Sequence, residues 1–320
     1  GPRQCGKTTL VQTLAPHRPY VSLDEENYFR TATEDPSGFV DSLPAQVTVD
    51  EAQRVPELLP AIKRSVDRNR GPGRFLLTGS ANLLFLPHMA ESLAGRMETV
   101  LLQPLTESEK ERRAGGFLNA LLSNGIKPAI GGESDGSEVS LPQRLVNGGF
   151  PEPLTRSAAR ARQWHRQYLK SILDRDIRDI ARIRDSDDVA RLLELLAART
   201  GELLNVSGLA QDVGMHRETI EQYLALLERL FLIRRLSAWH KSSANRMVKA
   251  PKIHVVDSGL AATLAGLSAE DWLGHRERMG HLLESFVVQQ AIAQAAWTTP
   301  DLRFWHYRDK DQEEVDLVIT

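Results

Sequence analysis

The chain of 320 residues has a hydrophobic fraction of 41% and a formal net charge of -2, which indicates a globular protein with room for two or three domains. No apolar run approaches the roughly 20 residues that a membrane-spanning helix needs, so we expect no membrane partner. A single cysteine, Cys5, excludes a framework of disulfide bonds and favours a reducing, cytoplasmic setting.

The chain opens on a complete phosphate-binding loop of the pattern G-x-x-x-x-G-K-[ST]. Its glycines let the backbone turn where a Cβ would clash, and the loop amides then converge on phosphate oxygens at the start of a helix. Lys7 offers a positive charge to the β- and γ-phosphates, and the Thr8 hydroxyl is placed to ligate Mg²⁺. The alternative is a glycine-rich turn that only opens a helix. The expected nucleotide-binding residues of the loop are Gly1, Pro2, Arg3, Gln4, Cys5, Gly6, Lys7, Thr8 and Thr9.

Neither an initiator Met nor residues for the buried strand that feeds such a loop precede Gly1. We therefore expect a fragment of a longer protein, cut at the N-terminus and also at the C-terminus. Within the loop, Cys5 stands at a variable position. The loop amides and Lys7 would lower the pKa of its thiol, which makes redox sensing one interpretation.

Short apolar runs alternate with helical patterns over the first hundred residues. Helices are expected at 9–14, ended by Pro16, and at 55–66. The expected strands are 20–23, 47–49, 75–77 and 99–102. Because strands that alternate with helices form a parallel sheet, the pattern predicts an α/β fold with the parallel sheet of a P-loop NTPase, its first strand missing.

The second of these strands is followed by two adjacent carboxylates. Asp50 would hold Mg²⁺ through its water shell, opposite Thr8. Glu51 would orient and polarise the water that attacks the γ-phosphate, which makes it the expected catalytic carboxylate. The alternative is that both acids cap the helix that follows. The intact loop upstream favours the catalytic interpretation.

Other polar residues could complete the nucleotide site. The third strand is followed by Thr78 and Ser80, either of which could sense the γ-phosphate, although turn chemistry alone also explains a Gly-Ser pair. Arg96 follows a helical pattern and a glycine, and could act as an arginine finger toward the nucleotide of a neighbouring subunit in a homo-oligomer. The alternative for Arg96 is a surface residue after a helix-ending glycine.

These motifs resemble those of a large prokaryotic family of AAA-type P-loop ATPases fused to a C-terminal domain of unknown function. The segments that carry the resemblance are 1–10, 49–56, 77–80, 93–96, 148–153, 168–177, 251–260 and 313–316. The resemblance implies an AAA-type ATPase domain followed by a helical and winged-helix domain and a restriction-endonuclease-like α/β tail. The expected domains are the ATPase domain at 1–105, a helix and flexible linker at 106–142, the winged-helix domain at 143–250 and the truncated tail at 251–320.

The residue pattern of the middle region gives its own reasons for a winged helix. A linker rich in Gly, Ser and acids over 123–141 precedes expected helices at 164–183 and 189–198. A short helix at 207–213 capped by Ser207, a tight turn at Gly214 and a longer helix at 217–230 then follow the pattern of a helix-turn-helix. The apolar runs 231–236 and 252–256 could pair as the hairpin of the wing.

Positive charge is concentrated between these two runs. From Arg229 to Lys252 there are seven Lys or Arg and no carboxylate, a pattern that favours contact with DNA phosphates. The cations whose replacement should weaken such contact are Arg234, Arg235, Lys241 and Lys249. Glutamates at 218, 221 and 228 in the longer helix weaken this interpretation. The alternative is a winged helix used for packing or protein contact.

The last sixty residues predict a helix at 279–295 that carries Glu284 and strands at 302–305 and 314–319. In the context of the family this resembles a restriction-endonuclease core, in which Glu284, Asp316 and a Glu/Asp-x-Lys on the next strand would bind a metal ion. The sequence stops before that strand, so we do not expect these residues to cut DNA. The alternative is that both acids are ordinary surface carboxylates.

The leading hypothesis is an ATP-binding, Mg²⁺-dependent ATPase coupled to a winged-helix, DNA-contacting domain. The alternative is a nucleotide-gated switch that binds protein or DNA with little hydrolysis. A P-loop phosphotransferase is disfavoured because Glu51 suits water activation and no lid of clustered Arg follows the sheet. The chain also lacks the guanine-reading Asn/Thr-Lys-x-Asp strand end, which favours ATP over GTP.

Overall fold

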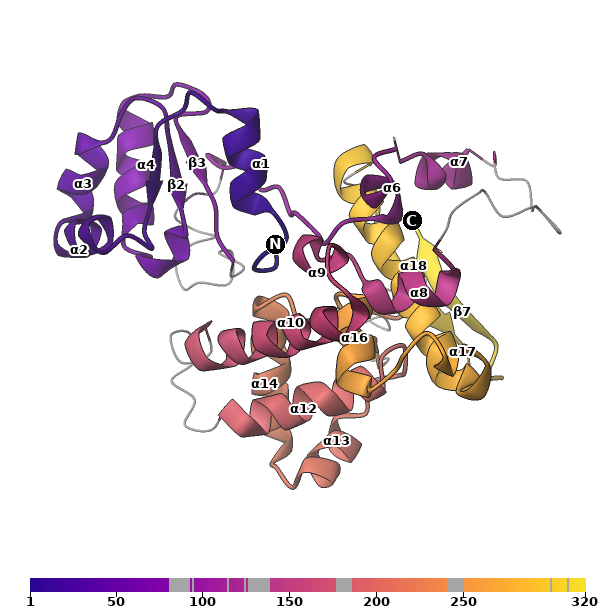
Figure 1. Ribbon diagram of the computed structural model, residues 1–320. Coiled ribbons are helices and arrows are strands. Elements are labelled where there is room, and N and C mark those ends of the chain that lie inside the picture. The colour runs from indigo at the N-terminus through magenta and orange to yellow at the C-terminus, as the bar shows by residue number, and fades with distance from the viewer. Residues whose placement is uncertain are drawn as a thin grey trace. The chain divides into compact units, whose positions relative to one another are not determined.

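The computed structural model divides into two compact units, Gly1–Gln103 and Pro104–Thr320. The residues that the structure describes are 1–80, 93, 95–113, 115–123, 125, 139–176, 186–240, 250–299, 301–309 and 311–320. In Figure 1 the first unit runs from indigo to purple and the second from magenta to yellow. Because the chain divides in this way, the sheets and the cores belong to one unit or the other.

The first unit is built on a parallel three-stranded sheet (Figure 1). The central strand β2 (Val47–Asp50) pairs with β1 (Tyr20–Ser22) on one side and with β3 (Phe75–Leu77) on the other. The helices of this unit are α1 (Lys7–Leu14), α2 (Glu26–Glu34), α3 (Pro36–Ser42) and α4 (Leu58–Arg68), with a 3-10 turn at Ala52–Arg54. Every residue of β2 is buried, as expected for a parallel strand that is covered on both faces.

Apolar side chains of α4 form much of the core of the first unit. Leu58, Leu59 and Ile62 follow helical spacing and pack in one cluster with Val47 and Val49 of the central strand. Each is no more than 3% exposed, so each stabilises the unit by about 1.5–3 kcal/mol. This core fixes the direction of the strands and hence the edge of the sheet at which they end.

The strand expected at 99–102 is absent from the described part of the chain. These residues adopt no regular structure, because a strand exists only where a neighbour supplies a hydrogen-bonded ladder. Instead the carbonyl oxygen of Leu102 lies against the phosphate loop and accepts a hydrogen bond from the Cys5 Sγ at 3.7 Å. A Cβ at Gly1 would stand 2.0 Å from the same oxygen, so this close approach requires glycine.

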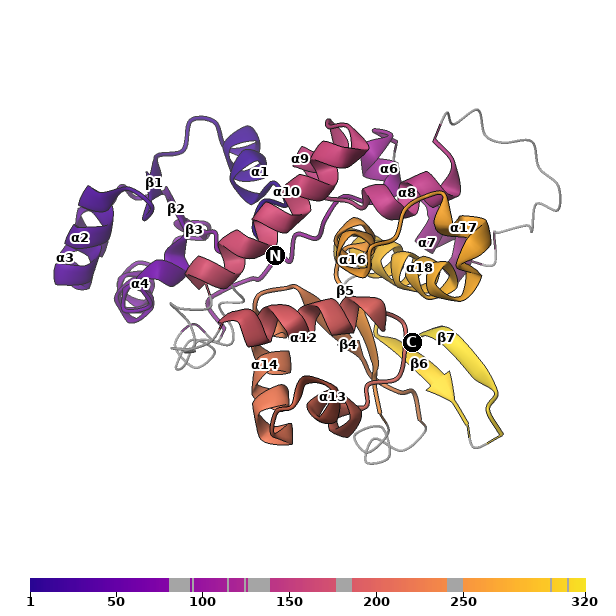
Figure 2. The ribbon, with the colours of Figure 1, turned by 60° about the horizontal axis from the view of Figure 1, so that its bottom comes forward.

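The second unit is mostly helical and carries two antiparallel strand pairs (Figure 2). Strand β4 (Ile233–Leu236) pairs with β5 (Lys252–Val255), and β6 (Phe304–Arg308) pairs with β7 (Glu314–Ile319). Its helices are α6 (Glu107–Lys110), α7 (Phe117–Leu122), α8 (Leu141–Asn147), α9 (Pro151–Leu154), α10 (Ala158–Ser171), α12 (Ser186–Ala198), α13 (Val206–Val213), α14 (Arg217–Arg229), α16 (Ser258–Ala265), α17 (Asp271–Gly274) and α18 (Arg276–Thr298), with a π-helical turn at Ile172–Asp176. Within the described residues, no helix combines the length and the apolar character needed to cross a membrane.

The pairing of β4 with β5 confirms the hairpin expected from the sequence. Gly214 ends α13 with a φ of 70°, which confirms the expected turn. The helix cap was predicted wrongly: Asn205, not Ser207, precedes the first turn and accepts a hydrogen bond from the Gly208 amide at 3.0 Å. Both residue types cap helices well, so only the start of the helix decides between them.

Asp257 joins two distant parts of the second unit. Its carboxylate accepts hydrogen bonds from the Leu260 amide at 2.8 Å, which caps α16, and from the Gly149 amide at 2.6 Å. Gly148 has a φ of 66°, and a Cβ there would stand 2.4 Å from the same carboxylate. Residues on both sides of position 250 therefore share one core, in which Phe150 packs on Tyr168 with ring centroids 4.9 Å apart.

Several expected segments lie wholly or partly outside the described residues. Most of the linker expected at 123–141 lies there, as do positions 177–183 of the expected helix at 164–183. The helix expected at 189–198 is confirmed as α12, and the strand expected at 314–319 is confirmed as β7.

Candidate functional site

The phosphate loop ends at Gly6, which adopts a φ of 97° and precedes the first residue of α1. Gln4 also lies in the left-handed region, with a φ of 59°. Among the described residues no side chain caps α1, and its first turn carries no acidic residue. The amides of that turn and the positive end of the helix dipole therefore favour an anion at this position.

The Lys7 ammonium lies over its own loop. It donates hydrogen bonds to the carbonyl oxygens of Gly1, at 3.2 Å, and Pro2, at 2.5 Å. These partners are neutral, so they orient the ammonium without cancelling its charge. A lysine held in this way can offer a point charge to phosphate oxygens.

Asp50 ends the central strand and is only 5% exposed. Its carboxylate accepts hydrogen bonds from the hydroxyl groups of Thr8, at 3.2 Å, and of Thr78 and Tyr20. The structure thus brings three of the residues predicted for the nucleotide site, Thr8, Asp50 and Thr78, together at the carboxyl edge of the sheet. Parallel α/β sheets bind their ligands at this edge.

The donor set around Asp50 fits a magnesium ion. The Thr8 hydroxyl and the Asp50 carboxylate are hard oxygen ligands of the kind that Mg²⁺ prefers. Adjacent oxygens around an ion with bonds of 2.0–2.1 Å lie about 2.9 Å apart. The observed separation of 3.2 Å therefore lets both residues face one hydrated ion.

Glu51 is held separately from Asp50. It has a φ of 56°, a left-handed conformation that costs a non-glycine residue about 1–3 kcal/mol and that is enriched at active sites. Its carboxylate accepts hydrogen bonds from the Gln53 amide and from the Ser80 hydroxyl, the latter at 3.3 Å. Gln53 also donates to Ser80 at 3.0 Å. The structure therefore places Ser80 beside Glu51 and Thr78 beside Asp50.

Tyr20 and Gln53 were not expected from the sequence. Burial and the hydrogen bond to Asp50 raise the pKa of Tyr20, so its hydroxyl remains a donor at neutral pH. Tyr20 opens β1, whose Ser22 is in register with Asp50. Tyr20 lies two residues before Ser22, so its side chain can reach the Asp50 carboxylate. This proximity becomes evident only when the pairing of the two strands is known.

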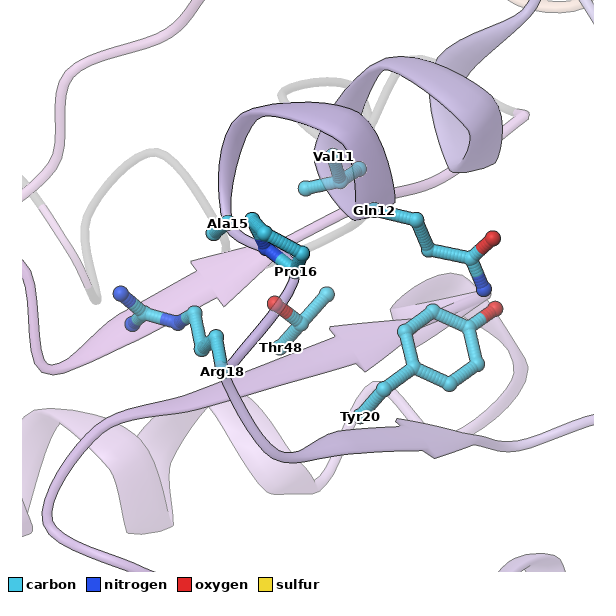
Figure 3. A pocket seen from close by; sticks show the side chains of 7 residues that line it. All are labelled: Val11, Gln12, Ala15, Pro16, Arg18, Tyr20 and Thr48. Carbon is cyan, nitrogen blue, oxygen red and sulfur yellow. The ribbon is translucent and has the colours of Figure 1, made fainter.

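The Tyr20 ring also lines a small cavity behind α1 (Figure 3). The cavity has a volume of about 280 Å³ and is lined by Val11, Gln12, Ala15, Pro16, Arg18, Tyr20 and Thr48. Figure 3 shows that these side chains come from α1, from the segment after it and from two strands of the sheet. Tyr20 thus connects this cavity to Asp50.

Arg96 lies apart from this constellation in an ion pair with α4. Its Nε donates to the Asp67 carboxylate at 2.6 Å, and both side chains are about one third exposed. The hydrogen bond raises the pKa of Arg96 and lowers the pKa of Asp67. A role of Arg96 toward a neighbouring subunit stays a prediction, and it requires this ion pair to open.

The Cys5 thiol is buried, with 3% of the residue exposed. Burial raises its pKa and outweighs the lowering by Lys7 and by the loop amides. The expected fall in this pKa is therefore wrong, and with it the physical reason for redox sensing. The side chain instead packs the loop against the Leu102 carbonyl.

Part of the basic stretch between 229 and 252 is neutralised within the second unit. Arg235 donates to Glu228 at 2.9 Å and lies 3.5 Å from Glu221. The Lys252 ammonium lies 2.8 Å from both Glu284 and Asp316. Positions 241–249, which include Lys241 and Lys249, lie outside the described residues. The described cations therefore offer less charge to DNA than their number suggests.

Comparison with known protein families finds an AAA domain over residues 1–110. A domain of unknown function (DUF8612) matches 138–271, and another domain of unknown function (DUF4143) matches 279–320. The parallel sheet of the first unit fits a P-loop-like domain.

Two similar proteins are the uncharacterized protein Rv2008c of Mycobacterium tuberculosis and the uncharacterized protein Mb2031c of Mycobacterium bovis. Each is 30% identical over 321 residues, which cover 100% of this chain and 66% of the relative. The chain thus spans 66% of the length of these relatives. No solved structure matches the chain.

Proposed function

The chain belongs to the proteins that join an N-terminal AAA domain to a C-terminal domain of unknown function, and from that architecture we propose that its first unit binds ATP and hydrolyses it with Mg²⁺ as cofactor. One observation carries the proposal: the hydroxyl of Thr8 in the loop helix meets the carboxylate of Asp50 at the end of the central strand, with Glu51 as the next residue. A glycine-rich turn that only opens a helix does not require this contact between Thr8 and Asp50.

The loop and Lys7 bind the phosphates of ATP in this proposal. The amides at the start of α1 donate to phosphate oxygens, and the Lys7 ammonium moves from its loop carbonyls to the β- and γ-phosphates. Thr8 and Asp50 would hold Mg²⁺, which neutralises charge on the phosphates during transfer.

Glu51 positions the attacking water. Gln53 and Ser80 orient its carboxylate by hydrogen bonds, so it can accept a proton from the water as the oxygen attacks the γ-phosphorus. The bond from the γ-phosphorus to the β-phosphate oxygen breaks, and ADP and phosphate leave. Thr78 and Ser80 each contact one of the two carboxylates, which supports a role for them in sensing the γ-phosphate.

The alternative is a nucleotide-gated switch with little hydrolysis, and one observation favours it. Arg96, the residue expected to supply a positive charge to the transition state, is paired with Asp67. Hydrolysis would then be slow until an assembly releases Arg96. The partner of the second unit is DNA or protein in either case, and the pairing of Arg235 with Glu228 gives the protein alternative more weight.

Binding of a fluorescent ATP analogue tests the proposal. Replacing Lys7 by Ala removes charged hydrogen bonds worth about 1.5–3 kcal/mol, so the dissociation constant should rise about 10- to 150-fold. Lys63→Ala, on α4, is the matched control and should bind as the wild type does. Equal affinity of Lys7→Ala and the wild type would contradict nucleotide binding at the loop.

A further inference from the structure

Lys252 is a buried lysine in the second unit. It lies on β5, and only 3% of its side chain is exposed, although lysine is almost never buried unless it is paired. Its Nζ donates hydrogen bonds to Glu284 of α18 at 2.8 Å, to Asp316 of β7 at 2.8 Å, and to Glu314 of β7. We refer to these four residues as the Lys252 cluster.

The charges of the cluster depend on one another. Burial acts to lower the pKa of Lys252, but the hydrogen bonds from its ammonium to Asp316, Glu284 and Glu314 outweigh burial and raise it. The Glu284 side chain is only 10% exposed, and burial raises its pKa to about 7 in spite of the ammonium beside it. Without a cation at the position of Nζ, the carboxylates would repel one another in a poorly solvated place.

A metal ion does not fit between these carboxylates while Lys252 is in place. An ion bound by Glu284 and Asp316 would lie about 2.0–2.6 Å from their oxygens, depending on the metal. Nζ already lies 2.8 Å from one oxygen of each. The ion and the ammonium would therefore occupy the same point. In the described part of the chain, no group of three or more His, Cys, Asp or Glu is arranged to hold a metal.

We infer that the Lys252 ammonium takes the place of a divalent cation between Glu284 and Asp316, so that the Lys252 cluster ties β5 to α18 and β7 as a structural ion cluster rather than serving as a metal-dependent catalytic centre. The metal site expected for Glu284 and Asp316 is thereby replaced by an internal ion pair. This inference does not depend on the proposed ATPase activity of the first unit.

The residues next to the cluster support a structural role. His254, two positions after Lys252, shares a hydrogen bond of 2.8 Å with Ser285 of α18, and Ser285 lies 2.9 Å from the Thr200 hydroxyl. Burial lowers the pKa of His254 to about 3, so the ring is neutral at pH 7. A second polar connection between β5 and α18 thus adjoins the ion pair.

Ala238 and His306 form a bridge that places β6 beside the segment after β4 (Figure 2).

Terbium luminescence tests the inference, because Tb³⁺ prefers oxygen ligands at distances similar to those of Ca²⁺, about 2.3–2.6 Å. The protein is titrated with Tb³⁺ alone, without nucleotide, in an Asp50→Asn background that removes the other proposed cation ligand. In this background, the protein with no further change and the Glu284→Gln variant, both with Lys252 intact, should give the same Tb³⁺ titration. Lys252→Ala should bind Tb³⁺ at least tenfold more tightly, and adding Glu284→Gln should abolish the gain. Lys170→Ala, an exposed lysine of α10, is the matched control and should gain nothing.

Binding of Tb³⁺ to the protein with Lys252 intact, lost in Glu284→Gln, would overturn the inference. A folded Lys252→Ala variant that gains no site would also overturn it, because the carboxylates would then not converge on the place of a cation. Circular dichroism establishes whether this variant is folded. If it is not, the comparison of the wild type with Glu284→Gln decides, since equal titrations support the inference and unequal ones contradict it.

Discussion

Thr8, in the first turn of α1, donates its hydroxyl to Asp50, at the end of β2, over a distance of 3.2 Å and across 42 positions of sequence. The contact joins the phosphate loop to the carboxyl edge of the sheet. It is the relationship on which the proposed nucleotide site depends, and Tyr20 and Thr78 hold the same carboxylate.

Tyr20→Phe should weaken the use of magnesium. The Tyr20 hydroxyl donates to Asp50, and loss of this bond leaves the carboxylate with fewer donors to fix its position. We expect the Mg²⁺ concentration for half-maximal phosphate release to rise about 3- to 10-fold, which corresponds to about 0.7–1.4 kcal/mol, the net contribution of one ordinary hydrogen bond. ATP affinity measured without Mg²⁺ should stay the same. Tyr28→Phe, on the exposed part of α2, is the control, and identical Mg²⁺ curves for both variants would exclude the role of Tyr20.

Mixing two inactive variants tests the prediction that Arg96 acts on a neighbouring subunit. Arg96→Ala retains the loop and Lys7→Ala retains the arginine, so a shared interface should restore part of the phosphate release when the two are combined. Asp67→Asn removes the partner of Arg96 and should raise turnover at concentrations that favour assembly. Arg64→Ala, which removes a neighbouring cation of α4 but keeps Arg96 and the loop, is the control and should release phosphate on its own as the wild type does. No rescue at any ratio, with a monomeric sedimentation profile, would remove the idea.

The salt dependence of DNA binding should be shallower than the basic stretch suggests. Because Arg235 and Lys252 are paired with carboxylates, at most five of the seven cations of the stretch can contact DNA phosphates. The logarithm of the binding constant should therefore fall against the logarithm of the salt concentration with a slope no steeper than about -4.5. Lys241→Ala with Lys249→Ala should flatten the slope, whereas Arg235→Ala should leave it unchanged. An affinity that does not depend on salt would contradict DNA contact through this stretch and favour a protein partner.

The pH dependence of stability should report on Glu284. Burial raises its folded pKa to about 7, above the unfolded value of 4.5, so the folded state holds the proton more tightly. This term therefore reduces stability as pH rises from about 4.5 to 7, by about 2 kcal/mol after allowance for screening by solvent. The Glu284→Gln variant should lack this loss. Urea unfolding at several pH values measures it, and parallel pH profiles of wild type and variant would contradict the assignment.

His254 contributes a change of opposite sign in the same experiment. Its pKa is lowered from 6.5 to about 3 by burial, so stability from this group is lost as pH falls below about 6.5. The two terms oppose each other between about pH 4.5 and 6.5. We expect the free energy of unfolding of the wild type to change little with pH in that range. In Glu284→Gln, which lacks the opposing term, it should rise with pH.

Features set by neighbouring residues could be predicted from the sequence. The phosphate loop, the strand that ends in Asp50 and the turn at Gly214 each depend on a local pattern, and the hairpin of β4 and β5 follows from two apolar runs. Helices α2 and α3 were not predicted, although α2 is longer than α1, which was. Pro36 at the first position of α3, after the capping residue Asp35, is the signal that would have indicated this helix.

Features set by tertiary contacts could not be predicted in this way. Lys252 was counted in a basic stretch expected to contact DNA phosphates, but its partners Glu284 and Asp316 lie 32 and 64 positions away. Charge along the sequence does not reveal burial. The run at 99–102 has the composition of a strand, yet the described residues supply no ladder partner for it. Tyr20 meets Asp50 only after the strands are paired in their register.

Steady-state phosphate release by the wild type and by Glu51→Gln measures whether ATP is hydrolysed at this site. We expect Glu51→Gln to bind ATP as the wild type does and to lose turnover by roughly 10²–10⁴-fold, as is typical of a positioned acid–base group. Glu57→Gln, which lies just before α4, is the control and should keep the wild-type rate. Turnover of Glu51→Gln at the wild-type rate, or no turnover by the wild type above that of Lys7→Ala, would contradict this expectation.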